Sequence, residues 1–432
     1  MAKANSIMNI LVFTANDPSK KNLRIRYINS IQESLKKTIP TKIFWVICKP
    51  SKVSYFDSKD YSIYDIHQFK NGLELLSKIK PDVVIGSVGI EPIQYSLGLA
   101  AVFLKIPFIS FLGAKIIFHP LESNSRYKIF LKKIFSNNTS IDSNNEEFFK
   151  RLRFFLYKLN FLVKTKISIK LNLFQIIFET MCDLPSQLAL QPLKPNKISD
   201  LYIAHHENQK LNIVKKFVNE EKVIVTGHPL LDQIQKIFSE KQSKLNKPSQ
   251  KKILIVTDSL FEHGLWSYEK RDKFLQTLLK TISENFYFDI KIHPSSEDIE
   301  YYNELINSLN LSANIFQEEE LFQLLDQYDL VISYGYSTSH TEISYVGMKM
   351  ILIYSGLSLP KFPLVEEGID SGHIKECSKI SELPSLILNF FKEEVIFNEK
   401  FIQSRNKMFY KSDGKSSERI SNAIINLLSQ KG

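Results

Sequence analysis

The chain has 432 residues, more than the roughly 250 to 300 that one hydrophobic core supports, so we expect two domains. With 44% apolar, 24% charged and 12% aromatic residues, the composition is that of a folded globular protein and excludes disorder. The three cysteines, Cys48, Cys182 and Cys377, are isolated, which argues against a disulfide framework or a thiolate zinc site. The sequence shows no signal-peptide pattern and no stretch apolar enough to span a bilayer, so we expect a cytoplasmic protein.

Short β-branched runs alternate with spacers of helical length, which is typical of βα units around a parallel sheet. These runs are 10–13, 43–47, 82–85, 108–111, 201–204, 223–225, 253–256, 288–292, 315–316, 330–332 and 350–353. A polar stretch predicts a linker near 241–250 between two α/β domains. Right-handed crossovers place the carboxyl ends of parallel strands at one edge of each sheet, where such sheets bind ligands.

Glu91 lies in a loop of the first domain, Gly86-Ser87-Val88-Gly89-Ile90-Glu91, between a strand and a helix. At the carboxyl end of a strand, its carboxylate is a candidate general base facing a cleft. The alternative is a structural glutamate that stabilises the N-terminus of the following helix.

Histidines follow two further strands of the first domain. His205 and His206 follow the 201–204 run, and His228 follows the 223–225 run, so imidazoles approach the same edge. Adjacent histidines do not normally share one metal and no HExxH spacing occurs, so no metal site is expected. Neither a GxGxxG nor a GxxxxGK[ST] pattern occurs, and no dinucleotide or other cofactor is expected.

Basic charge is concentrated in residues 126–180, where eleven Lys/Arg face four Asp/Glu and supply +7 of the formal net charge of +10. One helical face there is apolar, formed by Phe148, Leu152, Phe155, Leu156, Leu159 and Leu162. Two interpretations stay open: a helix that packs on the first domain, or a basic amphipathic helix on the inner face of the plasma membrane. Nucleic-acid binding is not expected, since no recognisable module accompanies the charge.

In the second domain we expect helices over 269–283, 297–309 and 319–327 and another after 336–338. The hydroxyl residues Ser337 and Thr338 stand where that last helix should begin, so free N–H groups there favour a phosphate. Glu342 follows about one turn later, where its carboxylate could accept from ribose hydroxyls. The alternative is a plain helix cap with a surface glutamate.

His293 ends the 288–292 strand, directly before Pro294, and projects at the same edge. It is a candidate donor to a phosphate oxygen, or else a structural histidine bonded to a loop carbonyl. His263 lies in the polar loop Thr257 to Gly264 after the first strand of this domain, and we count it among the nucleotide-sugar-binding candidates together with His228.

Taken in chain order, several segments resemble the GT-B superfamily of nucleotide-sugar enzymes, in particular UDP-N-acetylglucosamine 2-epimerases. The matching segments are Lys80-Pro81-Asp82-Val83-Val84, Ser199 to Glu207, Val223 to Pro229 with Asp232, Lys291-Ile292-His293-Pro294, Gly335 to Gly347, and Asp413 to Ile420. The resemblance implies two Rossmann-like domains facing a central cleft, with the donor's phosphate and ribose held by His293, Ser337, Thr338 and Glu342.

The sequence departs from the epimerase pattern where proton transfer at the sugar would need carboxylates. Gly86-Ser87-Val88 stands where the family shows Gly-Asp-Thr, and Ser110 to Ala114 stands where it shows His-x-Glu-Ala-Gly. The His293-Pro294 pair and Gly335-Tyr336-Ser337-Thr338 look more like motifs of bacterial sialyltransferases and CDP-glycerol polymer transferases. The resemblance therefore favours fold rather than epimerase chemistry.

We interpret the chain as a metal-independent GT-B glycosyltransferase with a UDP- or CMP-linked donor and a cell-surface polysaccharide or glycolipid acceptor. The expected domains are an acceptor domain over 1–240 with the basic insert 126–180, a nucleotide-sugar domain over 251–395, and C-terminal helices over 396–432 that pack back toward the first. The alternatives are an epimerase-like isomerase or hydrolase, and a non-catalytic nucleotide-sugar-binding protein.

Overall fold

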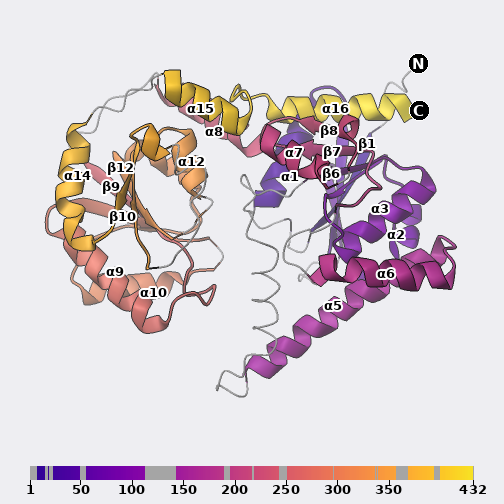
Figure 1. The fold of residues 1–432 in the computed structure, drawn as a ribbon, viewed down its shortest axis with the longest axis horizontal. Coiled ribbons are helices and arrows are strands. Elements are labelled where there is room, and N and C mark those ends of the chain that lie inside the picture. Colours follow the sequence, from indigo (N-terminus) through magenta and orange to yellow (C-terminus); the bar gives the residue numbers. More distant parts are fainter. Residues whose placement is uncertain are drawn as a thin grey trace. The chain divides into compact units, whose positions relative to one another are not determined.

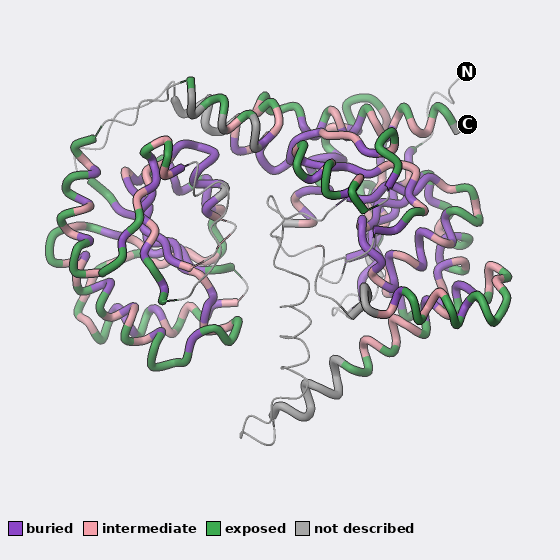
Figure 2. Tube along the Cα trace, in the orientation of Figure 1, coloured by how far each residue is buried: buried purple, intermediate pink, exposed green. Residues whose placement is uncertain are grey.

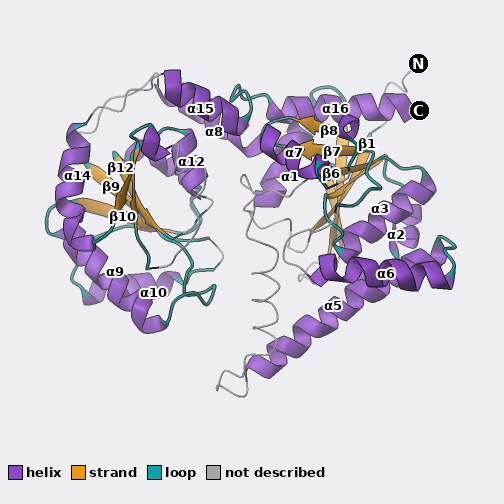
Figure 3. Cartoon of the chain, viewed as in Figure 1, coloured by secondary structure: helices purple, strands orange, loops and turns teal. Residues whose placement is uncertain are grey.

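The protein was analysed as a computed structural model that describes residues 7–14, 18, 23–48, 55–111, 143–188, 195–216, 218–242, 251–294, 296–335, 337, 339–356, 368–393 and 399–431. The chain forms two compact units (Figure 1). The first unit combines 1–230 with 415–432, and the second is 231–414. Each is an α/β structure with helices around one sheet (Figure 3).

The first unit contains an eight-stranded sheet in the order β3-β4-β2-β1-β5-β6-β7-β8. All neighbouring strands are parallel except the β3–β4 pair. The strands are β1 (Met8–Thr14), β2 (Thr41–Ile47), β3 (Tyr55–Asp57), β4 (Tyr61–Asp65), β5 (Val83–Ser87), β6 (Phe108–Phe111), β7 (Leu201–Ala204) and β8 (Val223–Val225). The helical segments are α1 (Leu23–Lys36), η1 (Ile66–Gln68), α2 (Gly72–Ile79), α3 (Pro92–Leu104), α5 (Ser143–Ser168), α6 (Leu173–Leu188), α7 (Glu207–Val214), η2 (Glu220–Lys222) and α16 (Ser416–Lys431).

Apolar side chains on both faces of the first sheet form the core, as buried parallel strands require. The strands of this sheet are largely buried (Figure 2). One face packs against α1 and α16. Ile420 and Ile424 of α16 are fully buried in the same cluster as Ile28 and Ile31 of α1. The opposite face packs against α2, α3 and part of α5, including Phe161. The C-terminal helix α16 thus belongs to the first unit, where Arg419 also donates to the carbonyl of Thr226 at 2.8 Å.

The second unit contains a six-stranded, wholly parallel sheet in the order β11-β10-β9-β12-β13-β14. Its strands are β9 (Lys252–Val256), β10 (Tyr287–Lys291), β11 (Ile315–Phe316), β12 (Leu330–Tyr334), β13 (Met350–Ile353) and β14 (Ile374–Cys377). Its helical segments are α8 (Pro229–Gln242, in this unit from Leu231), α9 (Tyr268–Ser283), α10 (Ile299–Ser308), α11 (Leu321–Leu324), η3 (Leu325–Gln327), α12 (Ser339–Tyr345), η4 (Ile380–Glu382), α14 (Leu383–Lys392) and α15 (Glu399–Phe409).

The second unit includes α8 and α15, which lie outside the 251–395 range expected from the sequence. Side-chain contacts account for this grouping, because Tyr345 of α12 donates to Gln235 of α8 at 3.2 Å and packs edge-on against Phe409 of α15. Of the expected linker 241–250, only 241 and 242 are described, and they belong to the end of α8; 243–250 lie outside the described residues.

All eleven strands expected from the sequence are confirmed to within two residues, whereas β3, β4 and β14 were not anticipated. When its strands are numbered along the chain, the second sheet has the order 3-2-1-4-5-6. Without the antiparallel strand β3, the first sheet has the order 3-2-1-4-5-6-7, which adds β8 at the end. This is the Rossmann order, in which the chain reverses direction across the sheet at one switch point. The switch points lie between β1 and β5 and between β9 and β12, and they position the sites below.

Within the described residues, no helix combines the length and apolar character needed to cross a membrane.

Candidate functional site

The switch point of the second sheet brings Asp258 and Gly335 together. Asp258 is the second residue after β9, and Gly335 follows β12 with a positive φ of 75°. A Cβ atom added at Gly335 would overlap with Oδ2 of Asp258, so glycine is needed here for both its backbone angle and its size. Burial raises the pKa of Asp258 to about 7, which the positive charge of His263 partly opposes. A carboxyl group that is half protonated near neutral pH therefore lies at this crevice.

Glu297 joins the loops after β9 and β10. Its buried carboxylate accepts from the hydroxyl of Thr257, from the backbone N–H of His293 at 2.6 Å and from the hydroxyl of Tyr302. Its own carbonyl accepts from the side chain of Gln317 at 2.8 Å. With donors from several segments around one carboxylate, Glu297 fixes the loop in which His293 stands.

His293 stands at the accessible end of a chain of hydroxyl groups. Ser296 Oγ lies 2.7 Å from His293 Nδ1 and 2.7 Å from Ser259 Oγ, so the loops after β10 and β9 are linked side chain to side chain. His293 stays exposed, yet desolvation of its ring, together with the nearby charges of His263 and Lys291, lowers its pKa. The imidazole is therefore neutral at pH 7, and when Ser296 donates to Nδ1, Nε2 carries a proton that it can donate to a ligand.

The third loop of this edge leads into α12. Ser337 Oγ accepts from the backbone N–H of Ser339 at 3.3 Å and lies 2.6 Å from Ser339 Oγ, which is a local capping arrangement. His340 Nε2 lies 2.8 Å from Ser333 Oγ and ties α12 to β12; burial lowers the pKa of this histidine to about 4. Glu342 is buried on α12, and its charge acts on Lys291 of β10. Thr338 lies outside the described residues.

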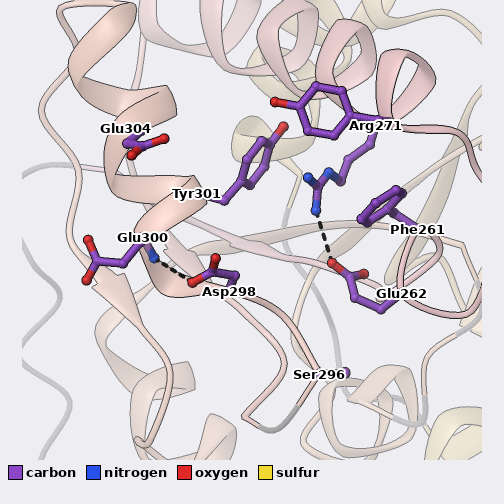
Figure 4. Close-up of a pocket in the computed structure, with 9 residues that line it drawn as sticks. Phe261, Glu262, Arg271, Ser296, Asp298, Glu300, Tyr301 and Glu304 are labelled. Atoms are coloured by element: carbon purple, nitrogen blue, oxygen red, sulfur yellow. Dashed lines mark hydrogen bonds and ion pairs between the residues drawn. The ribbon is translucent and has the colours of Figure 1, made fainter. Parts of the chain in front are cut away.

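A pocket of about 380 Å³ opens beside Ser296, between the loop after β9 and the start of α10 (Figure 4). The guanidinium group of Arg271 lies 3.7 Å from the ring centroid of Tyr301 and 4.1 Å from that of Phe261, and it pairs with Glu262 at 3.1 Å. The remaining lining residues are Tyr268, Asp298, Glu300 and Glu304. Four carboxylates thus surround one cation that is already paired, so this pocket disfavours a phosphate, which the adjacent His293 loop suits better.

The switch point of the first sheet holds Glu91 in a different environment. Glu91 caps α3: its Oε2 accepts from the N–H of Gln94 at 3.0 Å, and its Oε1 pairs with Lys158 of α5 at 3.1 Å. Arg24 of α1 donates to Gln94 at 3.2 Å, and burial lowers the pKa of Arg24 to about 10 despite the opposing charge of Glu91. Both carboxylate oxygens thus have partners within the protein, and two cations stand close by.

His228 is buried in the first unit. Its ring lies edge-on to Tyr27 at 5.2 Å and to His205 at 4.4 Å, and its Nδ1 accepts from the N–H of Leu230 at 3.2 Å. His205 is only 2% exposed and meets the hydroxyl of Tyr27 at 3.1 Å; burial, followed by the charges of His228 and His206, lowers its pKa well below the ordinary value. His228 therefore belongs to a buried aromatic cluster of the first unit.

A buried network includes Ser87 and Ser110, which stand where the epimerase pattern has its aspartate and its histidine. Leu112, which stands where that pattern has its glutamate, lies outside the described residues. Ser110 Oγ donates to the carbonyl of Ser87 at 2.9 Å and lies 2.6 Å from Ser199 Oγ, which in turn donates to Asn196 at 2.6 Å. Gly86 is required because an added Cβ would overlap with the ring of Phe108. The polar side chains of this network hydrogen-bond to one another, and Gly86 packs tightly against Phe108. This part of the first sheet therefore has a structural role.

Among the described residues, no three His, Cys, Asp or Glu side chains gather into a possible metal site.

The structure thus brings the loops that carry His263, His293 and Ser337 to one edge of one sheet, with Glu342 on the helix that follows. It adds Asp258, Ser296 and Glu297, which sequence reasoning did not select. The signal for Asp258 was present in the resemblance, because a Rossmann-like domain has the strand order 3-2-1-4-5-6, which makes the loop of Asp258 the neighbour of Gly335 across the switch point. No sequence signal marked Ser296 as the link to His293.

Comparison with known proteins gives no match to any family model. Over 245 residues the chain is 22% identical to a Clostridium acetobutylicum protein described as "Putative UDP-N-acetylglucosamine 2-epimerase"; the match covers 53% of this chain and 58% of that protein. The chain thus spans little more than half the length of this relative.

Similar solved structures include the UDP-GlcNAc 2-epimerase of Methanocaldococcus jannaschii, with a TM-score of 0.53 and 14% identity over 98% of this chain and 100% of that one. The Neisseria meningitidis UDP-GlcNAc 2-epimerase, bound to UDP-GlcNAc, matches with a TM-score of 0.52 and 14% identity over 98% and 100%. The spinosyn forosaminyltransferase SpnP matches with a TM-score of 0.51 and 12% identity over 98% and 99%. At these identities the likeness establishes the fold, two Rossmann-like domains of the GT-B type, and leaves the reaction open.

Proposed function

We propose that the protein is a nucleotide-sugar enzyme whose second unit holds the donor's phosphates at the loops after β9, β10 and β12. The observation that carries this proposal is the convergence at one switch point of Asp258, Gly335 and the Ser259–Ser296–His293 chain. Open α/β sheets bind ligands at such points, and Gly335 lets the backbone approach a ligand closely. The solved relative bound to UDP-GlcNAc supports a nucleotide-sugar ligand, and we expect a UDP- or CMP-linked donor.

Within this proposal the reaction is glycosyl transfer to a glycan or glycolipid acceptor. Glu91 stays the candidate base for the acceptor hydroxyl, although the hydroxyl would first have to displace Lys158 from the carboxylate. The departures from the epimerase pattern support transfer, because Ser87 stands where that pattern has its aspartate and Leu112 stands where it has its glutamate. The carbonyl of Ser87 also accepts from Ser110 within a buried network.

Epimerase-like isomerisation or hydrolysis is the second candidate, and the names of the sequence relative and of two structural neighbours favour it. The two reactions differ in what they need. An epimerase converts or releases the sugar with no acceptor, whereas a transferase turns over its donor rapidly only when an acceptor is present. Nuclear magnetic resonance of the products from each nucleotide sugar, with and without added glycan, separates them.

The donor site itself is tested by binding. UDP, CMP, CDP and GDP are titrated into the protein by calorimetry, and at least one is expected to bind. Replacing His293 with Ala should weaken that nucleotide about tenfold or more, since a hydrogen bond to a charged group contributes about 1.5–3 kcal/mol. Ser337→Ala should weaken it less, because Ser337 mainly caps α12.

The matched control is His67→Ala, which removes an exposed histidine of the first unit and should leave nucleotide affinity unchanged. Failure of all four nucleotides to bind, or equal affinities in the His293→Ala and wild-type proteins, would remove the donor site from the second unit.

A further inference from the structure

Helix α6 presents five large apolar side chains to solvent on one side. Leu173, Phe174, Ile177, Phe178 and Met181 are 70%, 78%, 56%, 60% and 64% exposed. We call this set the α6 apolar face; the exposed stretch of α6 can be followed in Figure 2. Isolated surface leucines are ordinary, but a contiguous apolar patch of this kind marks an interaction site.

The opposite side of α6 holds the helix in place, so the exposure of the apolar face is not due to an undocked helix. Ile176 is 3% exposed and Asp183 is 3% exposed. Lys166 of α5 is fully buried, where it lies 3.4 Å from Glu179 and donates to Thr180 at 3.3 Å. Residues 176, 180 and 183 thus lie on the side of α6 that faces the first unit. The α6 apolar face lies on the side that faces the solvent. On the outward side, the rings of Phe174 and Phe178 are parallel, with centroids 6.3 Å apart.

Among the residues of the α5–α6 hairpin whose side chains the structure describes, the exposed charged residues that have no ion-pair partner in the hairpin are basic. Arg153, Lys164 and Lys170 are exposed, and Lys170 lies in the turn directly before α6. The acidic side chains described between 152 and 184 are Glu179, which pairs with Lys166, and the buried Asp183. A partner for this surface therefore has to be apolar and anionic, whereas a second copy of the hairpin would bring cations against cations.

Helix α5 adds apolar residues to the same hairpin. Leu152, Leu156 and Ile167 are 38%, 54% and 55% exposed, while Leu162 and Phe161 are buried in the first unit. For α5, packing on the first domain and membrane contact were both left open by the sequence. Helix α5 packs on the first unit along one side and exposes apolar residues along another. Neither helix of the hairpin is long and apolar enough to cross a bilayer, so contact with lipid would be interfacial.

We propose that the α6 apolar face docks on an anionic lipid surface, with Arg153, Lys164 and Lys170 contributing electrostatic attraction. Apolar insertion and cationic attraction are the two independent contributions that reversible interfacial binding uses. This inference does not depend on the reaction, since it concerns a surface of the first unit remote in sequence from the nucleotide-binding loops. For a glycolipid acceptor, such docking would bring the enzyme to the layer that contains it.

The experiment is co-sedimentation of the full chain with vesicles of phosphatidylcholine alone and of phosphatidylcholine with 30% phosphatidylglycerol, at about 0.1 M salt. Binding is expected to the anionic vesicles and to fall as salt rises. The double variant Phe174→Gln/Phe178→Gln should lose at least about tenfold in affinity, because two exposed rings no longer insert. Lys164→Gln/Lys170→Gln should lose about fivefold per cation, from roughly 1 kcal/mol each.

The matched control is Val102→Gln/Phe103→Gln, which replaces two apolar residues of α3 that are 52% and 50% exposed. It should bind vesicles as wild type does, and all variants should keep the nucleotide affinity of the wild type, which separates this proposal from the donor site. Absence of binding to anionic vesicles, or equal binding by the α6 variant, overturns the inference. Self-association that the α6 variant abolishes would overturn it in favour of a second copy of the chain.

Discussion

Each of the two sheets has a carboxylate at its switch point, on opposite sides of that point, and the surroundings of the two carboxylates differ. Glu91, after β5 in the first sheet, caps α3 and pairs with Lys158, with Arg24 nearby. Asp258, after β9 in the second, is desolvated, and its pKa rises to about 7. Both stand at the switch point of a Rossmann-type sheet, so topology alone does not decide which one can receive an anion.

The difference lies in what surrounds each carboxyl group: Asp258 is desolvated, whereas Glu91 pairs with Lys158. A carboxyl group that takes up a proton near pH 7 can face a phosphate without charge repulsion, and it can donate a hydrogen bond while it is protonated. Glu91 has its oxygens occupied by a helix end and an ammonium group. This contrast supports the proposal that the second unit binds the anionic donor.

The largest expected effect comes from closing the crevice at Gly335. In Gly335→Ala the new methyl group would overlap with Asp258, and the φ of 75° would itself be strained. We expect the second unit to lose about 2–5 kcal/mol of unfolding free energy and the nucleotide to bind much more weakly. Urea unfolding followed with and without nucleotide measures both.

Gly372→Ala is the matched control, since Gly372 has a φ of 79° with open space around the position of a Cβ. It should cost only the backbone strain, about 1–2 kcal/mol, and leave nucleotide binding intact. If both variants behave alike, Asp258 and Gly335 do not form a crevice that a ligand uses.

The next effect tests the first unit. Glu91→Gln should reduce turnover of the donor about 100-fold in the presence of acceptor, because loss of a general base typically costs at least that factor. Donor affinity should stay unchanged, and the unfolding free energy should fall by no more than about 1 kcal/mol, since Gln can still cap α3. Steady-state kinetics with both substrates varied makes the measurement.

Lys158→Met is the companion variant, because it removes the partner of Glu91 and leaves the carboxylate in place. It should preserve most of the turnover. Normal turnover in Glu91→Gln would show that Glu91 only caps α3. The difference between the two carboxylates would then have no role in catalysis.

The smallest effect is a pH dependence centred on Asp258. If the phosphate is bound best when Asp258 is protonated, affinity should fall about fivefold between pH 7 and pH 8, one unit above its pKa. Asp258→Asn should remove this decrease in affinity. Any pH dependence that comes from titration of the ligand itself should appear equally in both proteins. Calorimetry at pH 6, 7 and 8 checks it.

The same shift affects stability with a definite sign. Because the folded state holds the proton more tightly than the unfolded chain, whose carboxyl has the ordinary pKa of 3.8, the unfolding free energy should decrease as pH rises from about 4 to 7. Asp258→Asn should remove that decrease. A variant with the same pH dependence as wild type would show that another group titrates.

Much of this fold follows from the sequence, because buried parallel strands are short β-branched runs and right-handed crossovers place their carboxyl ends at one edge of the sheet. The strand-end loops with His263 and His293 and the helix after Ser337 were located in the same way. The Ser259–Ser296–His293 chain could not be, since Ser296 meets two loops only after the sheet is assembled. The exposure of the α6 apolar face could not be predicted either. The sequence pattern of an amphipathic helix is the same whether its apolar side faces the core or the solvent.

The return of α16 to the first unit has a consequence for how the chain is made. Ile420 and Ile424 complete a core that begins at Met8, and the whole second unit lies between these segments in the sequence. On the ribosome, residues 231–414 emerge as one continuous stretch that can fold at once, whereas the first unit has to wait for its final helix. The face of α1 that α16 will cover therefore stays open throughout most of synthesis.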